Sequence, residues 1–127
     1  MNEIEIKYNT NGQLQYEMSK LNGEFHGIQK KYHDNGKIDK EWNYTNGVQN
    51  GIQRGWYENS NLYEIRLEID GRTHGIEQKW HRVGLRGILI CWRKGIPNGP
   101  KIIFKYYFKK YGNRDRKRIS RKWPTHV

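Results

Sequence analysis

The sequence predicts an all-β protein, an elongated meander of antiparallel β-hairpins from four 24-residue repeats, with a C-terminal cap and a basic tail. Aromatic residues recur every 24 residues, two series of glycines share that period, and apolar residues alternate with polar ones between them. Such fixed spacing is typical of repeat proteins, in which each unit contacts mainly its neighbours. The residues on this period are Tyr8, Tyr32, Trp56, Trp80 and Phe104, with glycines 23, 47, 71 and 95 and glycines 27, 51, 75 and 99.

The first strand of each repeat is expected to begin at a Gly-Ile pair. In residues 27–32, every second side chain from Ile28 to Tyr32 falls on one side of an extended chain. A period of two with β-branched and aromatic residues predicts a strand and not a helix. The same alternation recurs in residues 4–8, 51–56 and 75–80.

A polar break follows the first strand, and a second strand then leads to a tight turn. The breaks at residues 9–12, 33–36 and 58–61 contain turn-forming residues that tolerate positive φ. Asn-Gly and Asp-Gly between alternating strands are strong signals for a hairpin. The second strands, such as residues 14–18 and 38–44, end at Asn22-Gly23, Asn46-Gly47, Asp70-Gly71 and Lys94-Gly95.

The repeat array is expected to occupy residues 1–104, and an aromatic cap with a basic tail to occupy residues 105–127. The fourth repeat departs from the pattern, with Arg86 in place of a leucine and Pro100 in place of an isoleucine. Residues 101–111 are the most apolar and aromatic stretch. Because a meander leaves unpaired edges, we expect this stretch to cap the last edge as a strand or a short helix; the alternative is a docking segment for a partner.

The composition excludes several classes of protein. The 127 residues carry a net charge of +11, 34% are hydrophobic, and there is no alanine. No run of 18 apolar residues could form a transmembrane segment, and the N-terminus lacks the features of a signal peptide. Because Cys91 is the sole cysteine, no internal disulfide can form, and we expect an intracellular protein, cytoplasmic or virion-associated.

No group of residues matches a catalytic or metal-binding motif, so we expect no enzymatic activity, no cofactor and no metal. His26 and His74 share a repeat position, but about four strands, roughly 19 Å, would separate them. Turn chemistry therefore explains them better than a shared ion. The carboxylates are scattered without a pair suited to acid–base catalysis. Cys91 lies in an apolar strand and is expected to be inert.

The repeating unit, Asn-Gly-x-x-x-Gly-Ile-x-x-x-aromatic-x-x-x-Gly-x-Leu, resembles the MORN repeat in its bacterial and viral variant, which also occurs in proteins labelled antitoxin-like. Residues 44–51 and 92–99 carry the spacing of an aromatic residue and two glycines. The resemblance covers residues 4–104 and implies a sheet of stacked hairpins that serves as a scaffold or a membrane-associated module. It also implies a structural role for the repeated glycines and aromatic residues. Ser60, in place of a glycine, departs from the pattern.

Two groups of residues are candidates for binding. Tyr8, Tyr32, Trp56 and Trp80 form an aromatic stripe that could stack nucleic-acid bases, although cross-strand packing explains its period better. The second group is a basic run in residues 105–127, which hold nine Lys and Arg against Asp115 alone, a net charge of +8. Its members are Lys109, Lys110, Arg114, Arg116, Lys117, Arg118, Arg121 and Lys122.

The expected function is that of a non-catalytic scaffold that binds a protein partner, such as a structural component of a virion. The basic tail would contact an acidic partner, which could be nucleic acid, an anionic membrane surface or a protein; alternatively, it keeps the sheet soluble. Homo-oligomers are compatible with the sequence. The alternative functions are an antitoxin-like regulatory protein that contacts nucleic acid and an adaptor at a membrane surface.

Overall fold

A computed structural model describes residues 1–108 and 117–122, and all of its regular elements are strands. The strands are β1 (Asn2–Tyr8), β2 (Leu14–Leu21), β3 (Glu24–Phe25), β4 (Gly27–Tyr32), β5 (Ile38–Thr45), β6 (Val48–Gln49), β7 (Gly51–Trp56), β8 (Leu62–Ile69), β9 (Arg72–Trp80), β10 (Arg86–Arg93), β11 (Ile96–Phe108) and β12 (Lys117–Lys122). The described residues contain no helix, and the predicted all-β fold is confirmed.

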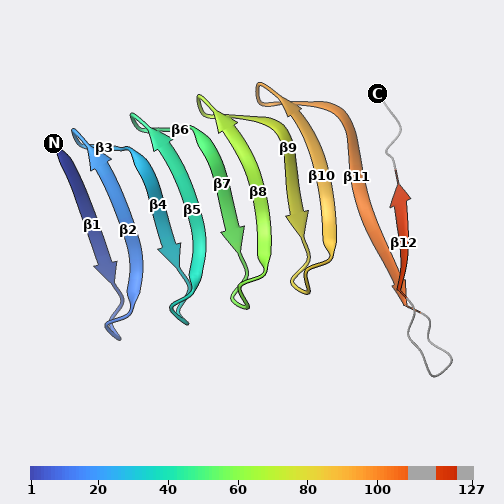
Figure 1. The fold of residues 1–127 in the computed structure, drawn as a ribbon, viewed down its shortest axis with the longest axis horizontal. Coiled ribbons are helices and arrows are strands. Elements are labelled where there is room, and N and C mark those ends of the chain that lie inside the picture. The colour runs from blue at the N-terminus through green and yellow to red at the C-terminus, as the bar shows by residue number, and fades with distance from the viewer. Residues whose placement is uncertain (109–116, 123–127) are drawn as a thin grey trace.

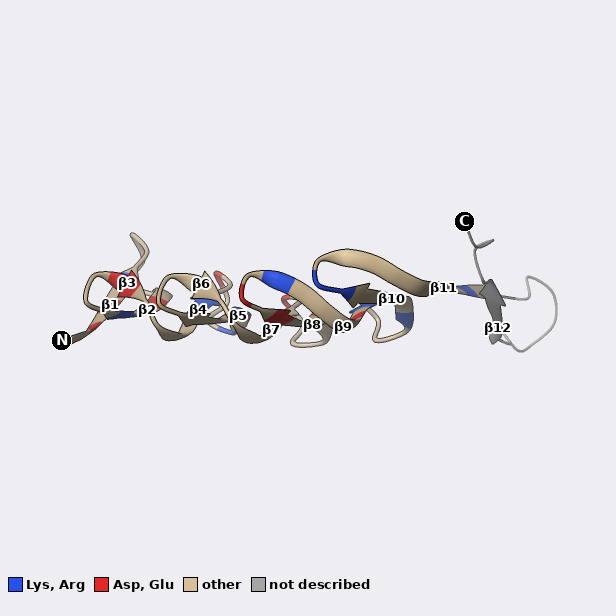
Figure 2. Ribbon diagram, turned by 90° about the horizontal axis from the view of Figure 1, so that it is seen from above, with Lys and Arg blue, Asp and Glu red and all other residues tan. Residues whose placement is uncertain are grey.

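The strands form one antiparallel sheet in which the long strands follow one another in chain order (Figure 1). The short strands β3 and β6 leave this path and pair with β2 and β5. Seen from above, the sheet is a single layer drawn out along its length (Figure 2). The predicted elongated meander of hairpins is therefore the observed architecture.

The turns at one end of the strands have the backbone geometry that their sequence predicts. At Asn46-Gly47, φ is 48° and 81°, the pair of positive values that a type I′ hairpin turn requires. The same pair of positive values occurs at Asn22-Gly23, Asp70-Gly71 and Lys94-Gly95. A non-glycine residue reaches this region at a cost, and asparagine and aspartate do so most readily. Lys94 does so too, with φ of 50°.

Neighbouring hairpins are also joined at both ends of the strands. At one end, Gly47 donates its backbone N–H to the carbonyl of Phe25, which belongs to the preceding hairpin, over 2.8 Å. At the other end, the Tyr57 hydroxyl donates to the carbonyl of Trp80 over 2.6 Å, and His33 Nε2 lies 2.8 Å from the carbonyl oxygen of Trp56. These contacts join residues 22 or 23 apart in the sequence, so they hold each hairpin against the next in a fixed register.

The sheet has two faces. We call the side that carries Ile28, Lys30 and Tyr32 the front face, and the side that carries Gln29 and Lys31 the back face. Because paired residues of neighbouring strands lie on the same face, the strand pairings assign the remaining residues of the sheet to one face or the other. Among the described residues, Phe104 is the only buried hydrophobic side chain. The buried polar side chains, Gln29, Gln53, Glu68 and Glu77, all lie on the back face.

At the C-terminal end of the sheet, residues 101–108 belong to strand β11, which decides between strand and helix for this part of the predicted cap. Strand β11 crosses the predicted domain boundary at residue 104 without a break. The backbone of residues 117–122 then pairs with β11 as β12. Lys117, Arg118, Arg121 and Lys122 of the predicted basic tail are therefore on a strand, whereas Lys109, Lys110, Arg114 and Arg116 lie outside the described residues.

Candidate interaction surface

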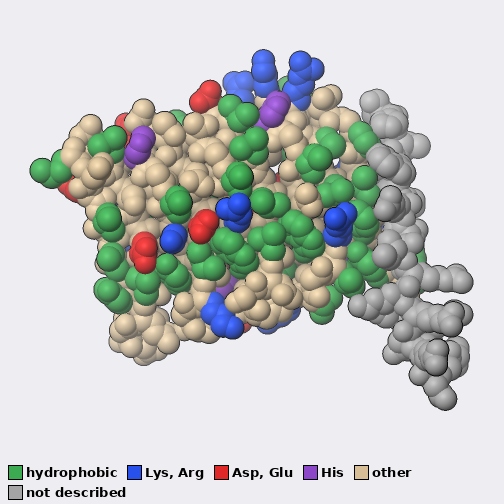
Figure 3. Space-filling model, viewed as in Figure 1, with side chains coloured by type: hydrophobic (Ala, Val, Ile, Leu, Met, Phe, Trp, Pro, Cys, Tyr) green, Lys and Arg blue, Asp and Glu red, His purple; other side chains and the backbone are tan. Residues whose placement is uncertain are grey.

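A row of isoleucines crosses the upper part of the front face. Ile4, Ile28, Ile52 and Ile76 follow one another at the 24-residue spacing, on β1, β4, β7 and β9. Their exposed fractions are 71%, 46%, 41% and 56%, because no second layer lies over them in the described part of the chain. Ser19, Asn43 and Leu67 of the intervening strands stand between them, and Cys91 on β10 follows Ile76. Figure 3 views this face and shows hydrophobic side chains spread over it.

A row of alternating charges lies beside the isoleucines. The strand pairings place Glu17 next to Lys30, Lys30 next to Glu41, and Glu41 next to Arg54. Arg54 Nη1 lies 3.7 Å from Glu41 Oε1. Figure 3 shows these alternating red and blue side chains across the N-terminal half of the sheet. Opposite charges at cross-strand positions stabilise a sheet, so this row supports the strand order of the chain itself.

The predicted aromatic stripe forms the third row of the front face. Tyr8, Tyr32, Trp56 and Trp80 end strands β1, β4, β7 and β9, and their direct cross-strand neighbours are Leu14, Ile38, Leu62 and Arg86. The aromatic residues therefore pack beside aliphatic or basic side chains rather than beside one another. Burial, followed by the negative charge of Glu17, raises the pKa of Tyr32, whose hydroxyl donates to Glu17 Oε1 over 3.2 Å.

The central row of the front face carries no charge in the C-terminal half of the sheet. In the row that begins with Glu17, the residues after Arg54 are Ile65, Gln78, Leu89 and Ile102. We call this region the apolar panel, which consists of Ile65, Leu67, Ile76, Gln78, Leu89, Cys91 and Ile102 on β8–β11. Arg86 borders the panel, with its guanidinium 6.0 Å from the ring centre of Phe104. Phe104 also lines a hollow of about 480 Å³ together with His81, Val83 and Leu85.

The back face carries an aromatic recess over β2–β5. Tyr16, Met18, Phe25, Trp42 and Tyr44 line a hollow of about 250 Å³, with Gln29 at its base. Three lysine ammonium groups stand over its rings: Lys20 over Phe25 at 5.6 Å, Lys31 over Tyr16 at 5.9 Å, and Lys40 over Trp42 at 5.9 Å. Such cation–π contacts hold the lysines at the rim of the recess, where they make its surroundings positive.

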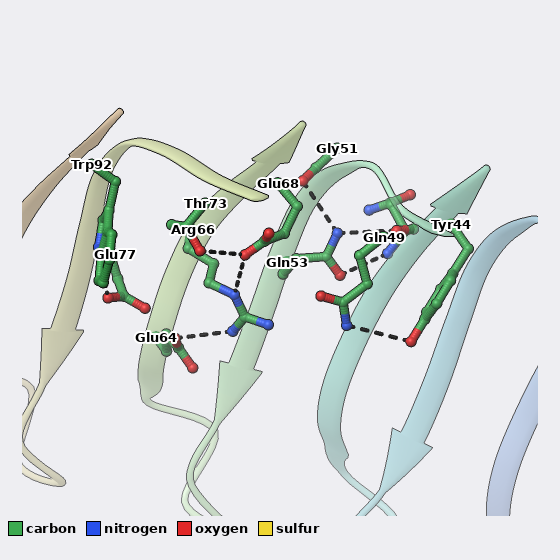
Figure 4. Close-up of polar contacts among 11 residues, drawn as sticks. Tyr44, Gln49, Gly51, Gln53, Glu64, Arg66, Glu68, Thr73, Glu77 and Trp92 are labelled. Atoms are coloured by element: carbon green, nitrogen blue, oxygen red, sulfur yellow. Dashed lines mark hydrogen bonds and ion pairs between the residues drawn. The ribbon is translucent and has the colours of Figure 1, made fainter. Parts of the chain in front are cut away.

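Two glutamines on the back face, Gln29 and Gln53, take the place of missing strand hydrogen bonds, and Figure 4 shows the contacts of Gln53. Gln53, which is 1% exposed, accepts a hydrogen bond from the Asn43 backbone N–H over 2.9 Å and donates to the carbonyls of Asn43 and Gly51. Gln29 makes the same three contacts with Ser19 and Gly27. This role was not predicted from the sequence, although the 24-residue spacing of the two glutamines is a signal for it.

A polar cluster occupies the same face over β8–β10 (Figure 4). Arg66 Nε donates to Glu68 Oε1 over 2.8 Å, and its Nη1 donates to Glu64 Oε1 over 3.0 Å. Thr73 also donates to Glu68, over 2.7 Å. The buried carboxylate of Glu68 therefore has a cationic and a neutral partner at Oε1, and such pairing offsets the cost of keeping a charge inside a protein.

Glu64 and Glu77 form a carboxyl pair next to this cluster, which was not predicted from the sequence. Burial raises the pKa of Glu77, and its hydrogen bond with Glu64 and the charge of Glu64 raise it further. Burial also acts to raise the pKa of Glu64, but the hydrogen bond with Glu77 and the charge of Arg66 outweigh it and lower that pKa. Folding therefore favours the protonated form of Glu77 and the ionised form of Glu64. Trp92 donates its indole N–H to Glu77 over 3.2 Å.

The carboxyl pair leads to a prediction that depends on pH. Replacing Glu77 with Gln, the residue at this repeat position in residues 29 and 53, should raise the free energy of unfolding at pH 7 by about 1 kcal/mol. Because folding raises the pKa of Glu77, the folded chain loses stability as the pH rises from the unfolded to the folded pKa, and Gln avoids this loss. The gain should therefore shrink towards pH 4.

Thermal unfolding at pH 4 and pH 7 measures this effect. Glu58→Gln, in an exposed turn, is the control and should change the unfolding temperature equally little at both pH values. A Glu77→Gln variant that is less stable than the natural chain at pH 7 would contradict the raised pKa of Glu77 in the folded chain.

The histidines serve the turns, as the sequence predicts. Nδ1 of His26 accepts a hydrogen bond from the backbone N–H of Asn46 over 3.2 Å, and Nδ1 of His74 accepts one from Lys94 over 3.4 Å. Asn50 does the same for Asp70 through its side-chain oxygen. Among the residues that the structure describes, no group of three or more His, Cys, Asp and Glu is arranged to hold a metal ion.

Comparison with models of protein families, with curated proteins and with solved structures finds no match for the chain. Within residues 1–108 and 117–122 there is no apolar helix of the length needed to cross a membrane.

Proposed function

We propose that the chain is a non-catalytic repeat scaffold that binds a protein partner through the front face of its sheet. The observation that supports this most strongly is the exposure of the front-face isoleucines, from 41% at Ile52 to 71% at Ile4. Soluble monomers rarely expose contiguous apolar surface of this kind, and where they do it often marks a binding site. The resemblance to MORN repeats agrees with a scaffold role.

A protein partner would supply the layer that this sheet lacks. A sheet with an apolar face is normally packed against a second sheet or a helix, yet Phe104 is the only buried hydrophobic side chain among the described residues. The apolar panel is the best-suited contact region because its central row carries no charge that binding would have to desolvate. Trp56 and Trp80, which lie beside it, are of the residue type most often dominant in interfaces.

The basic tail would contact an acidic surface of the assembly. Residues 105–127 carry a net charge of +8, and the chain carries +11. A structural component of a larger particle such as a virion would bind a protein neighbour through the apolar panel and an acidic neighbour through the basic tail. Cationic runs bind polyanions with an affinity that falls as the salt concentration rises.

A second candidate function is nucleic-acid binding by the back face, as in an antitoxin-like regulator. The observation that favours it is the aromatic recess with Lys20, Lys31 and Lys40 at its rim. Aromatic rings stack bases and lysines neutralise phosphates on many sheets that bind single strands. Titration with a labelled single-stranded oligonucleotide, with Trp42→Ala as the test variant, separates this function from the scaffold.

The scaffold proposal predicts that a charge in the apolar panel abolishes partner capture. Ile76→Lys on the front face should remove the captured protein, because the lysine would have to be desolvated on binding. Ile103→Lys is the matched control: Ile103 is also an exposed isoleucine, but its pairing with Ile88 places it on the back face. Affinity capture from the native host with both variants measures the difference.

Equal capture by the two variants would contradict the front face as the binding surface. A third variant, in which the basic residues of the tail are replaced with Gln, tests the acidic neighbour. This variant should capture less of the acidic neighbour, and the binding that it loses should be the salt-sensitive part of the binding of the natural chain.

A further inference from the structure

We propose that the N-terminal half of the front face also binds a second copy of this chain, face to face. The two copies would be related by a two-fold axis that runs parallel to the strands, between β4 and β5. This interaction concerns the chain alone and involves β1–β8; it shares Ile65 and Leu67 of β8 with the apolar panel, whereas most of the panel lies on β9–β11. The two proposals can therefore fail separately.

The row of alternating charges on the front face meets opposite charges when a second copy lies over it in reverse order. Read across the sheet from β2 to β7, its signs are negative, positive, negative and positive, at Glu17, Lys30, Glu41 and Arg54. A two-fold axis between β4 and β5 reverses the order of the row in the second copy. Glu17 then faces the Arg54 of the second copy, and Lys30 faces its Glu41. Each charge would thus keep its opposite neighbour within the chain and gain another across the interface.

No other position of the axis pairs all four charges. An axis through Lys30 sets Glu17 against the Glu41 of the second copy, and an axis through Glu41 sets Lys30 against its Arg54. An axis between β5 and β7 sets Lys30 against Ile65, and one between β2 and β4 sets Glu41 against Ile6. Like charges and unpaired charges in an interface are costly. The charges therefore select one register.

The other two rows fit the same register. The axis runs along the strands, so each row of one copy meets the same row of the other. In the isoleucine row, Ile4 would face Leu67 and Ile52 would face Ser19. In the aromatic row, Tyr8 would face Leu62, Trp56 would face Leu14 and Tyr32 would face Ile38. None of these residues is charged. Two sheets packed face to face at about 10 Å form an ordinary sandwich.

The contact area is at the lower end for a specific dimer. The six long strands from β1 to β8 span roughly 29 Å at about 4.8 Å per strand, and three rows of residues span about 17 Å along them. This footprint is roughly 500 Å² per copy, or about 1,000 Å² in total, close to the minimum for a specific interface. We therefore expect a dimer that forms and dissociates with concentration.

The experiment uses two variants of the full chain, Lys30→Glu and Glu41→Lys, in sedimentation velocity between about 5 µM and 500 µM. Each variant alone would place like charges across both symmetric contacts and should dimerise at least about tenfold more weakly than the natural chain. Mixed in equal amounts, they should recover dimer, because the two glutamates of one chain then face the two lysines of the other. Lys31→Glu is the control, since residue 31 lies on the back face.

The mixture separates an interface from a fault in folding. Each variant also places like charges next to one another within its own sheet, but mixing cannot repair that. Recovery of dimer only in the mixture, with unchanged dimerisation of Lys31→Glu, would support the proposed arrangement. A natural chain that stays monomeric up to 500 µM would overturn it. So would a mixture with no more dimer than the separate variants, or single variants that dimerise like the natural chain.

Discussion

Replacing Gln53 with Leu should reduce the free energy of unfolding by about 2–4 kcal/mol. Gln53 is 1% exposed, and its amide satisfies the Asn43 N–H and the Gly51 carbonyl, at a place where the backbone ladder between β5 and β7 is interrupted. Leucine has a similar volume but no polar atoms, so these backbone groups would be left without this partner. The carbonyl of Asn43 would keep its bond from the Asn50 N–H.

Chemical denaturation of Gln53→Leu and of Gln78→Leu measures the effect. Gln78 is the matched control because it lies on the front face in the apolar panel, where leucine is compatible with its neighbours Ile65 and Leu89. We expect the control to change stability by less than about 0.5 kcal/mol, as is usual at surface positions. Similar losses for the two variants would mean that the Gln53 amide has no special part in joining the hairpins.

Replacing Gly47 with Val should cost more than about 1 kcal/mol, because φ at this position is 81° and a β-branched residue is poorly tolerated there. The cost comes from the backbone and not from crowding: a Cβ at Gly47 would meet Glu24 only at 3.7 Å, an ordinary contact. The turn also places the Gly47 N–H on the Phe25 carbonyl, so a distorted turn would weaken the join to the preceding hairpin as well.

Gly55→Val is the control for this prediction. Gly55 is also a glycine of the sheet, but its φ is not positive, and a Cβ there would meet its nearest atom, Cδ1 of Tyr63, at 3.6 Å. Lysine occupies the same repeat position at residues 31 and 79, so a side chain fits. Thermal unfolding should show a marked loss for Gly47→Val and little change for Gly55→Val. The off-period Gly112 would be a less informative control, since it lies outside the described residues.

Much of the fold could be predicted because local chemistry decides it. The turn at Asn46-Gly47 needs two positive φ values, and few residue pairs supply them. The alternation from Ile28 to Tyr32 commits that segment to a strand with one consistent face. Since both signals recur at one spacing, consecutive hairpins lie side by side. The turn role of His26 and His74 followed from the same spacing.

The site was less predictable because it depends on register between strands. Glu64 and Glu77 meet only because β8 and β9 pair with Glu64 opposite Lys79, which places Glu77 diagonally across. A sequence pattern shows which face a residue takes, but not which residue stands opposite after a bulge shifts the register, as it does between Ile65 and Leu67. The amide of Gln53 fills a gap in the ladder that is visible only once the strands are placed.

The sequence by itself determined the strands, the turns and the single-sheet meander, because these follow from the preferred φ of individual residues and from alternation within short segments. Only the tertiary structure decided which side chains of different strands become neighbours on each face of the sheet. Strand pairing aligned Glu17, Lys30, Glu41 and Arg54 in one row of alternating sign. It also assembled the apolar panel from β8–β11 and left it exposed. These arrangements depend on how neighbouring strands align with one another. Hydrogen bonds between residues distant in sequence fix that alignment.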